Sequence, residues 1–163
     1  MASSCIVRSA RPDDATDSAA LLRESILQLC IADHQNDPAT LERWLRNKTP
    51  DHFQQWLANP DKYVIVAELD SLLCGVGLLN ASGDLELCYV RPGRQRAGIG
   101  RALLGALEDQ ARRWGLGEIR LISSADARTF YERHGYLSTG ERSTPGFGVL
   151  RDYLYRKVLS IRA

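Results

Sequence analysis

The chain has 163 residues, 44% of them hydrophobic and 25% charged, and its 21 Lys and Arg residues against 20 Asp and Glu residues leave a formal net charge of +1. This is the composition of an ordinary folded domain, and it excludes a disordered chain. Near neutrality removes the general electrostatic case for a nucleic-acid or membrane-surface protein, and no apolar run approaches the roughly 20 residues that cross a bilayer.

The length predicts a single domain, 1–163, that buries its own core. The first residues lack the apolar stretch of a signal peptide. The four cysteines show no Cys-x-x-Cys spacing; they are Cys5, Cys30, Cys74 and Cys88. We therefore expect a protein of the reducing cytoplasm, with thiols that act as small apolar residues and with no metal site.

The first third of the chain is predicted to be helical after a short strand at 5–7. Apolar residues between Ala15 and Leu29 recur at steps of three and four, which predicts a helix with one buried face. Two shorter helices are predicted to begin at Asp37-Pro38 and Thr49-Pro50, because a capping side chain followed by proline is a helix start signal.

The rest of the chain alternates strands and helices, which predicts one mixed α/β layer structure. The segments 63–69 and 72–79 are expected to form a hairpin that turns at Asp70-Ser71. The further strands are expected at 85–90, 119–123 and 149–158, and the helices at 99–114 and 126–134, each helix ended by a glycine.

Strict alternation along the strand at 85–90 would divide its side chains between the two faces of a sheet. One face would carry Leu85, Leu87 and Tyr89. The other would carry Asp84, Glu86, Cys88 and Val90.

The segment from Arg91 to Gly98 joins a predicted strand to a predicted helix and contains glycines. Glycines at such a junction expose backbone N–H groups, and the helix dipole adds positive potential, so the place suits a phosphate. Four arginines surround the helix start: Arg91, Arg94, Arg96 and Arg101. A solvated loop with a glycine cap is the alternative. The spacing fits neither the dinucleotide fingerprint, which needs a third glycine, nor the nucleotide-triphosphate loop, which needs Lys-Ser/Thr.

Two motifs carry a family resemblance. The run Gln95-x-x-Gly98-x-Gly100, after a strand ending in Val90-x-Pro92, resembles the acetyl-CoA pyrophosphate loop of the GNAT (GCN5-related N-acetyltransferase) superfamily. The segment 124–136, Ser-Ala-Asp-Ala-Arg-Thr-Phe-Tyr-Glu-Arg-His-Gly-Tyr, resembles that family's Asn-x-x-Ala-x-x-Phe-Tyr-x-x-x-Gly-Phe helix. The resemblance covers 63–136, and Ser124 departs from it by replacing the usual Asn.

The resemblance implies a single-domain GNAT-like α/β fold, with a mixed central sheet splayed between its fourth and fifth strands and helices on both faces. It implies an acetyl-CoA-binding core at 63–136 and a helical acceptor-side region at 13–58. The pantetheine arm would lie in the splay, held by the backbone of Cys88 and Val90. The Val90 N–H would polarise the thioester carbonyl. The implied acetyl-CoA contacts are Cys88, Tyr89, Val90, Gln95, Arg96, Ala97, Gly98, Ile99, Gly100, Arg101, Ser124 and Ala127, although Gln95 could equally order the loop.

Acyl transfer to an amine needs a base, since an amine of pKa about 10.4 is mostly protonated at neutral pH. Glu86 or Asp84 could serve, and we favour Glu86 because it lies nearer the thioester; a solvated carboxylate is the alternative. The resemblance makes Tyr131 the residue that protonates the departing CoA sulfur, with a core tyrosine as the alternative. Cys88 is expected to pack rather than to carry an acyl group.

The resemblance thus implies an acetyl-CoA-dependent N-acetyltransferase that acts directly on a primary amine of a small molecule. From the composition and the cysteine spacing we expect no metal, nucleic acid or membrane. Protein or peptide acetylation and a non-catalytic CoA-binding module are the alternatives. Frequent dimers in the family make a homodimer an expectation. The acceptor pocket could include His34, although a surface loop histidine is favoured, and the aromatic residues Trp44, Phe53 and Trp56, although core packing is favoured.

Overall fold

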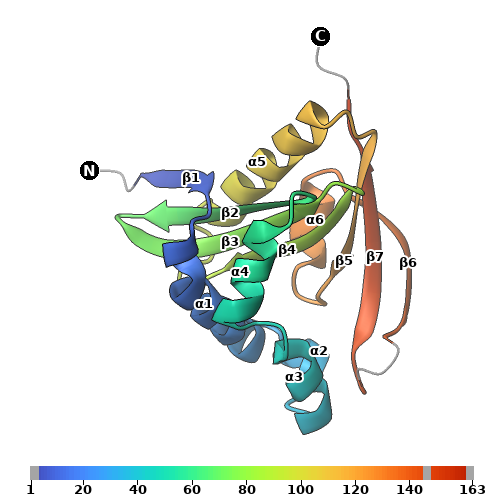
Figure 1. The fold of residues 1–163 in the computed structure, drawn as a ribbon. Coiled ribbons are helices and arrows are strands. Elements are labelled where there is room, and N and C mark those ends of the chain that lie inside the picture. Colours follow the sequence, from blue (N-terminus) through green and yellow to red (C-terminus); the bar gives the residue numbers. More distant parts are fainter. Residues whose placement is uncertain (1–3, 145–147, 161–163) are drawn as a thin grey trace.

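The computed structural model describes residues 4–144 and 148–160, which form a single seven-stranded sheet with helices on both faces (Figure 1). The strand order is β1-β2-β3-β4-β5-β7-β6. The strands are β1 (Cys5–Ser9), β2 (Lys62–Leu69), β3 (Leu72–Asn80), β4 (Asp84–Val90), β5 (Glu118–Ser123), β6 (Leu137–Ser143) and β7 (Arg151–Val158). The α-helices are α1 (Ala15–Leu29), α2 (Ile31–His34), α3 (Pro38–Leu45), α4 (Pro50–Ala58), α5 (Ile99–Arg113) and α6 (Arg128–Arg133).

The sheet divides between β4 and β5. All neighbouring strands are antiparallel except this pair, which is parallel and is joined only at Asp84–Arg120 and Leu85–Leu121. Beyond Leu85 the two strands continue to Val90 and Ser123 without pairing. The expected mixed sheet, splayed between its fourth and fifth strands, is confirmed.

Each face of the sheet has its own core. Helix α5 covers one face, and two glycines of β3 allow it to come close: a Cβ at Gly75 would lie 2.8 Å from the side chains of Ile99 and Leu103. The other face packs against α1 and α4 around Leu22, Phe53 and further apolar side chains of β2, β3 and β4. The expected helices on both faces are confirmed.

A β-bulge in β4 contradicts the strict alternation expected along this strand. Leu79 is opposite Leu85 while Leu78 is opposite Leu87, so Glu86 is an extra residue without a counterpart on β3. Leu85 therefore packs in the core beneath α5, whereas Leu87 packs in the core beneath α1. Cys88 and Val90 lie on the α5 face.

The bulge also moves Glu86 away from the face that carries Val90. The carboxylate of Glu86 accepts a hydrogen bond from Lys62 of β2. Val64, two residues after Lys62 on β2, packs in the core beneath α1. Since side chains two residues apart on a strand share a face, Lys62 lies on the α1 side of the sheet, and its partner Glu86 lies there too. The expectation that Glu86 and Val90 share a face was wrong, because an inserted residue cannot be read from periodicity.

The local start signals are confirmed. The side chain of Asp37 accepts a hydrogen bond from the Thr40 N–H, and that of Thr49 accepts one from the His52 N–H. The hairpin turns at Asp70 and Ser71, both with positive φ. The expected final strand begins two residues later, at Arg151, and the expected helix at 126–134 is the shorter α6. No helix among the described residues could span a membrane.

Candidate active site

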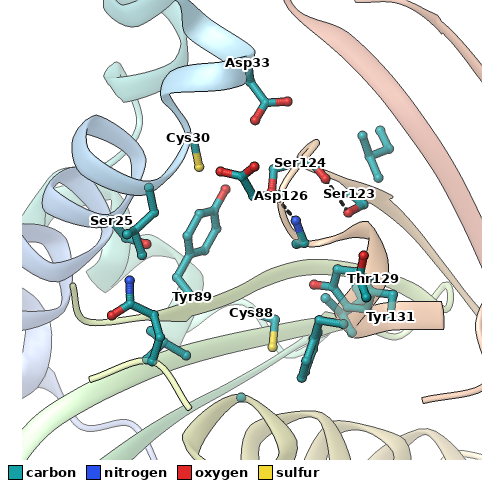
Figure 2. Close-up of a pocket in the computed structure, with 18 of the residues that line it drawn as sticks. Ser25, Cys30, Asp33, Cys88, Tyr89, Ser123, Ser124, Asp126, Thr129 and Tyr131 are labelled. Atoms are coloured by element: carbon teal, nitrogen blue, oxygen red, sulfur yellow. Dashed lines mark hydrogen bonds between the residues drawn. The ribbon is translucent and has the colours of Figure 1, made fainter. Parts of the chain in front are cut away.

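A cavity of about 760 Å³ opens where β4 and β5 separate (Figure 2). Its walls come from β4, the turn before α5, the β5–α6 connection and the helices α1 to α3. All the predicted acetyl-CoA contacts line it except Ala97. Of the predicted catalytic residues, Tyr131 and Glu86 line this cavity. Asp84 lines only a separate hollow between β4, β5, β6 and β7, which Glu86 also borders.

The backbone of β4 presents hydrogen-bonding groups to this cavity. The Arg91 N–H donates to the Cys74 carbonyl of β3 at 2.7 Å. Because backbone groups in an antiparallel pair alternate between the partner strand and the opposite edge, those of Cys88 and Val90 face the open edge. An extended ligand could therefore pair with them as an added strand would.

The turn before α5 has the form of an anion site. Gly98 is the N-cap of this 15-residue helix with φ +79°, Arg96 has φ +67°, and a Cβ at Gly98 would meet no atom within 4 Å. The first amides of α5 thus face open space and carry the positive end of the helix dipole. The side chain of Gln95 accepts a hydrogen bond from the Gly93 N–H at 2.7 Å, so it orders the loop.

Three of the four arginines near this turn line the cavity: Arg94, Arg96 and Arg101. Arg91 does not, because its Nε donates to the Leu73 carbonyl at 2.9 Å and its guanidinium lies 3.8 Å from Glu24. The cluster of four cations expected from the sequence is therefore a cluster of three.

Tyr131 lies on α6 beside the open edge of β4. The residue is 6% exposed, and the Cys88 thiol lies close enough to influence the pKa of its hydroxyl. Burial raises the pKa of Tyr131 well above its usual value, so this phenol keeps its proton at neutral pH. The neighbouring ring of Phe130 packs closely against Gly100, since a Cβ at Gly100 would lie only 3.3 Å from this ring. This close contact holds α6 against the start of α5.

We expect the Cys88 thiol to be protonated at neutral pH. Burial raises its pKa to about 12, and the Tyr131 hydroxyl lowers it by a smaller amount. The thiolate is the nucleophilic form of cysteine. The arrangement therefore does not favour an acyl group carried on Cys88.

Glu86 lies in the bulge with its carboxylate paired. The Lys62 ammonium donates to both of its oxygens, at 2.9 and 2.7 Å, and the Asn80 amide donates at 3.4 Å. Lys48 is 7% exposed, and burial lowers its pKa to about 8. The nearby carboxylate of Glu86 raises the pKa of Lys48, but by a smaller amount. Asp84 instead bonds to Ser82 at 2.8 Å and lies 3.3 Å from the Arg120 guanidinium.

The opposite end of the cavity holds polar residues that the sequence did not single out: Ser25, Cys30, Asp33 and Asp126. Trp44 also lines it and lies close enough to influence the pKa of Tyr89. His34 is not at the surface as favoured, because it is fully buried and binds the Ile26 carbonyl and the Asn36 N–H through its two ring nitrogens. Phe53 is fully buried in the core, and Trp56 packs against it.

No sequence signal pointed to Asp33, because it lies in the four-residue α2 outside any motif. Ser124, the departure from the family pattern, accepts a weak hydrogen bond of 3.3 Å from the Ala127 N–H at the start of α6. No group of three or more metal-binding side chains occurs within residues 4–144 and 148–160.

Comparisons with known proteins agree with this geometry. A family model described as an acetyltransferase (GNAT) domain matches residues 24–146, about three quarters of the chain. An "IAA acetyltransferase" of Azospirillum brasilense is 28% identical over 136 residues, which cover 76% of this chain and 87% of the relative.

Solved structures have the same fold. A GCN5-related N-acetyltransferase of Rhodopseudomonas palustris aligns with a TM-score of 0.86 at 24% identity over 98% of both chains. The PaiA N-acetyltransferase of Thermoplasma acidophilum, solved in complex with coenzyme A, aligns with a TM-score of 0.79 at 22% identity over 96% of this chain and 99% of its own.

Proposed function

Since the chain belongs to the GNAT acetyltransferase family, we propose that it transfers the acetyl group of acetyl-CoA directly to a primary amine of a small molecule. The observation that carries this proposal is the open edge of β4, where the backbone of Cys88 and Val90 faces a cavity that Tyr131 also lines. The relative named an acetyltransferase and the similar structure in complex with coenzyme A support the cosubstrate.

The cavity suits the two halves of acetyl-CoA in different places. The amides at Gly98, Ile99 and Gly100, with the arginines of the turn, would hold the pyrophosphate. The backbone of Cys88 and Val90 would hold the pantetheine arm, with the Val90 N–H polarising the thioester carbonyl.

The bulge supports a division of proton transfer between the two faces of β4. Glu86 lies on the face of α1, from which an acceptor would enter, and would take the proton from the attacking amine, directly or through water. Tyr131 lies beside Cys88 on the opposite face and would donate its proton to the departing CoA sulfur.

The closure of the acceptor end supports a small molecule over a peptide. Val149, two residues before β7, contacts α3, where its N–H donates to the Thr40 hydroxyl at 3.3 Å. Leu150, together with Arg151 and Asp152 at the start of β7, lines the cavity along with Trp44 of α3. A peptide acceptor would need an open groove at this place.

The test is release of CoA thiol from acetyl-CoA by purified protein, measured against small primary amines, amino acids and peptides. Turnover with small amines and none with peptides is the expected result. Turnover with peptides alone would show that the acceptor is a protein or peptide. Tight acetyl-CoA binding without any turnover would favour a non-catalytic CoA-binding module.

The base is tested by the Glu86→Gln variant. We expect kcat to fall by about 10²-fold while acetyl-CoA affinity stays the same, because the amide cannot accept the proton. The Asp84→Asn variant is the matched control, and we expect it to keep wild-type kcat because Asp84 lies outside the main cavity. Damage by Asp84→Asn with a silent Glu86→Gln would reverse the two roles.

A further inference from the structure

The acceptor end of the cavity contains a buried carboxylate with one unused oxygen. Asp33 is 5% exposed, and one of its oxygens accepts a hydrogen bond from the Ala125 N–H at 2.9 Å. Its other oxygen, Oδ2, is buried and has no hydrogen-bond partner among the described residues. A buried carboxylate oxygen without a partner is unfavourable, so Asp33 has an unused capacity to bind a donor or a cation.

A second carboxylate faces the same space. Asp126 comes from the turn between β5 and α6, and its charge acts on Asp33 strongly enough to contribute to a raised pKa, of which burial is the main cause. Figure 2 shows both carboxylates on the side of the cavity that the Tyr89 hydroxyl reaches. Two carboxylates brought together in this way repel each other unless a proton or a cation lies between them.

Arg128 and His34 lie close enough to lower the pKa of Asp33, but both also have other partners. Arg128 lies 4.3 Å above the Tyr153 ring, with its Nε donating to the Ala125 carbonyl at 3.1 Å. Both ring nitrogens of His34 are hydrogen-bonded to the backbone. Within residues 4–144 and 148–160, no lysine, arginine or histidine forms an ion pair with Asp33 or Asp126.

The position of this pair relative to β4 distinguishes it from the reacting centre. Tyr89 projects from β4 with its hydroxyl toward Cys30 and Asp33, so the pair lies beyond the phenol ring as seen from the strand. A reacting amine must be neutral when it attacks, whereas two carboxylates stabilise a charged ammonium. The pair is therefore suited to a different nitrogen from the one that is acetylated.

We propose that Asp33 and Asp126 form a specificity subsite for a second cationic group of the acceptor, so that the preferred substrates are diamines and related polycations. This inference rests on the proposed acetyl transfer. It gives the cavity two electrostatic ends: arginines of the turn before α5 for the phosphates of the cosubstrate, and the acidic pair for the acceptor.

The experiment compares 1,4-diaminobutane with 1-aminobutane, which differ by one amine. We expect wild-type kcat/KM for the diamine to exceed that for the monoamine by about tenfold or more. Asp33→Asn and Asp126→Asn should raise KM for the diamine by about tenfold, leave its kcat within about twofold and leave the monoamine values unchanged. Asn keeps the oxygen that accepts the Ala125 N–H, so the local fold is retained. Asp109→Asn, which removes the same charge from the exposed surface of α5, is the control.

The outcomes separate this inference from the proposed function. Equal kcat/KM for the two amines, or an equal loss for both in Asp33→Asn, would overturn the subsite while leaving acetyl transfer established. If neither amine is acetylated, calorimetry of the CoA-saturated protein decides: diamine binding that weakens about tenfold in Asp33→Asn supports the subsite, and no binding rejects it. Loss of acetyl-CoA binding in wild type would instead reject the proposed function.

Discussion

Tyr131 and Tyr136 are two buried phenols whose rings lie 5.6 Å apart, and their hydroxyl groups have different surroundings. Tyr131 lines the cavity together with Cys88. The Tyr136 hydroxyl donates to Glu108 at 3.0 Å inside the core, where Lys157 holds the same carboxylate. The first phenol lies where a ligand in the cavity could contact it, whereas the second is part of the core.

This contrast predicts opposite effects for one chemical change. Tyr131→Phe should lower kcat by roughly 10²-fold to 10⁴-fold with little change in stability, because it removes the donor for the leaving sulfur. Tyr136→Phe should leave kcat unchanged and cost about 1–3 kcal/mol of unfolding free energy, because it leaves a buried carboxylate without one of its donors. Steady-state kinetics and urea unfolding of both variants test this. Wild-type kcat in Tyr131→Phe would make that residue a packing tyrosine.

Asp33 makes stability depend on pH. Burial, together with the charge of Asp126, raises its pKa above the ordinary value of 3.8 in spite of the Ala125 N–H bond. A carboxyl whose pKa is raised by folding favours the folded state at pH values below 3.8, and this contribution is lost as the pH rises through the raised pKa. At neutral pH the charged form is therefore a cost to the fold.

We accordingly expect Asp33→Asn to be more stable than wild type at pH 7, by on the order of 1 kcal/mol. The difference should shrink as the pH falls through the raised pKa of Asp33 toward 3.8, because folded wild-type Asp33 becomes protonated over this range. Urea unfolding of the two proteins between pH 4 and pH 7 measures this. A variant that is less stable at every pH would show that the carboxylate is a structural group.

Helix α5 carries two glycines of left-handed conformation, one at each end. Gly98 has φ +79° at its N-terminus and Gly115 has φ +75° after its C-terminus, and a Cβ at either would meet no atom within 4 Å. Only Gly98 lines the cavity. Gly98→Glu and Gly115→Glu therefore impose a similar backbone strain, of the order of 1 kcal/mol, but add the charge in different places.

Calorimetric titration with CoA should show affinity reduced by about tenfold or more in Gly98→Glu, because bulk and negative charge enter the proposed site for the pyrophosphate. Gly115→Glu should bind CoA as wild type does. Equal CoA affinity in the two folded variants would contradict the proposal that the pyrophosphate binds at the start of α5.

The elements show which features the sequence could predict. Helices α1, α3 and α4, the β2–β3 hairpin and α5 follow from periodicity, capping residues and glycines, all of which are local. Strand β6 was missed because every one of its side chains is exposed, which leaves no apolar alternation. The bulge at Glu86 was missed because it depends on the register with β3.

The site divides in the same way. The turn before α5 and Tyr131 lie within sequence motifs, so their place could be predicted. Asp33 and Asp126 are brought together because α2 packs against the β5–α6 connection. The hydrogen bond between Asp33 and Ala125 joins residues that are 92 positions apart in the sequence. A contact of that range leaves no trace in a single sequence.

Across the whole molecule, binding of CoA should stabilise the fold by linkage. At a concentration of 100 times Kd, a ligand that binds only the folded state contributes about 2.7 kcal/mol. For a domain of this size that corresponds to a rise in Tm of roughly 5–10 °C. Thermal melts with and without CoA measure it. Gly98→Glu should show a much smaller rise at the same CoA concentration, and an unchanged Tm in wild type would contradict the proposed cosubstrate.

The open edge of β4 between Leu85 and Val90 has a consequence for solubility. An exposed strand edge is a template on which another chain can add, and proteins normally protect such edges. Here the protection would come from a metabolite, because the pantetheine arm would occupy the hydrogen-bonding groups that a second chain could otherwise use. We expect light scattering at elevated temperature to rise sooner without CoA than with it, so that the cell's supply of cosubstrate also limits self-association of the enzyme.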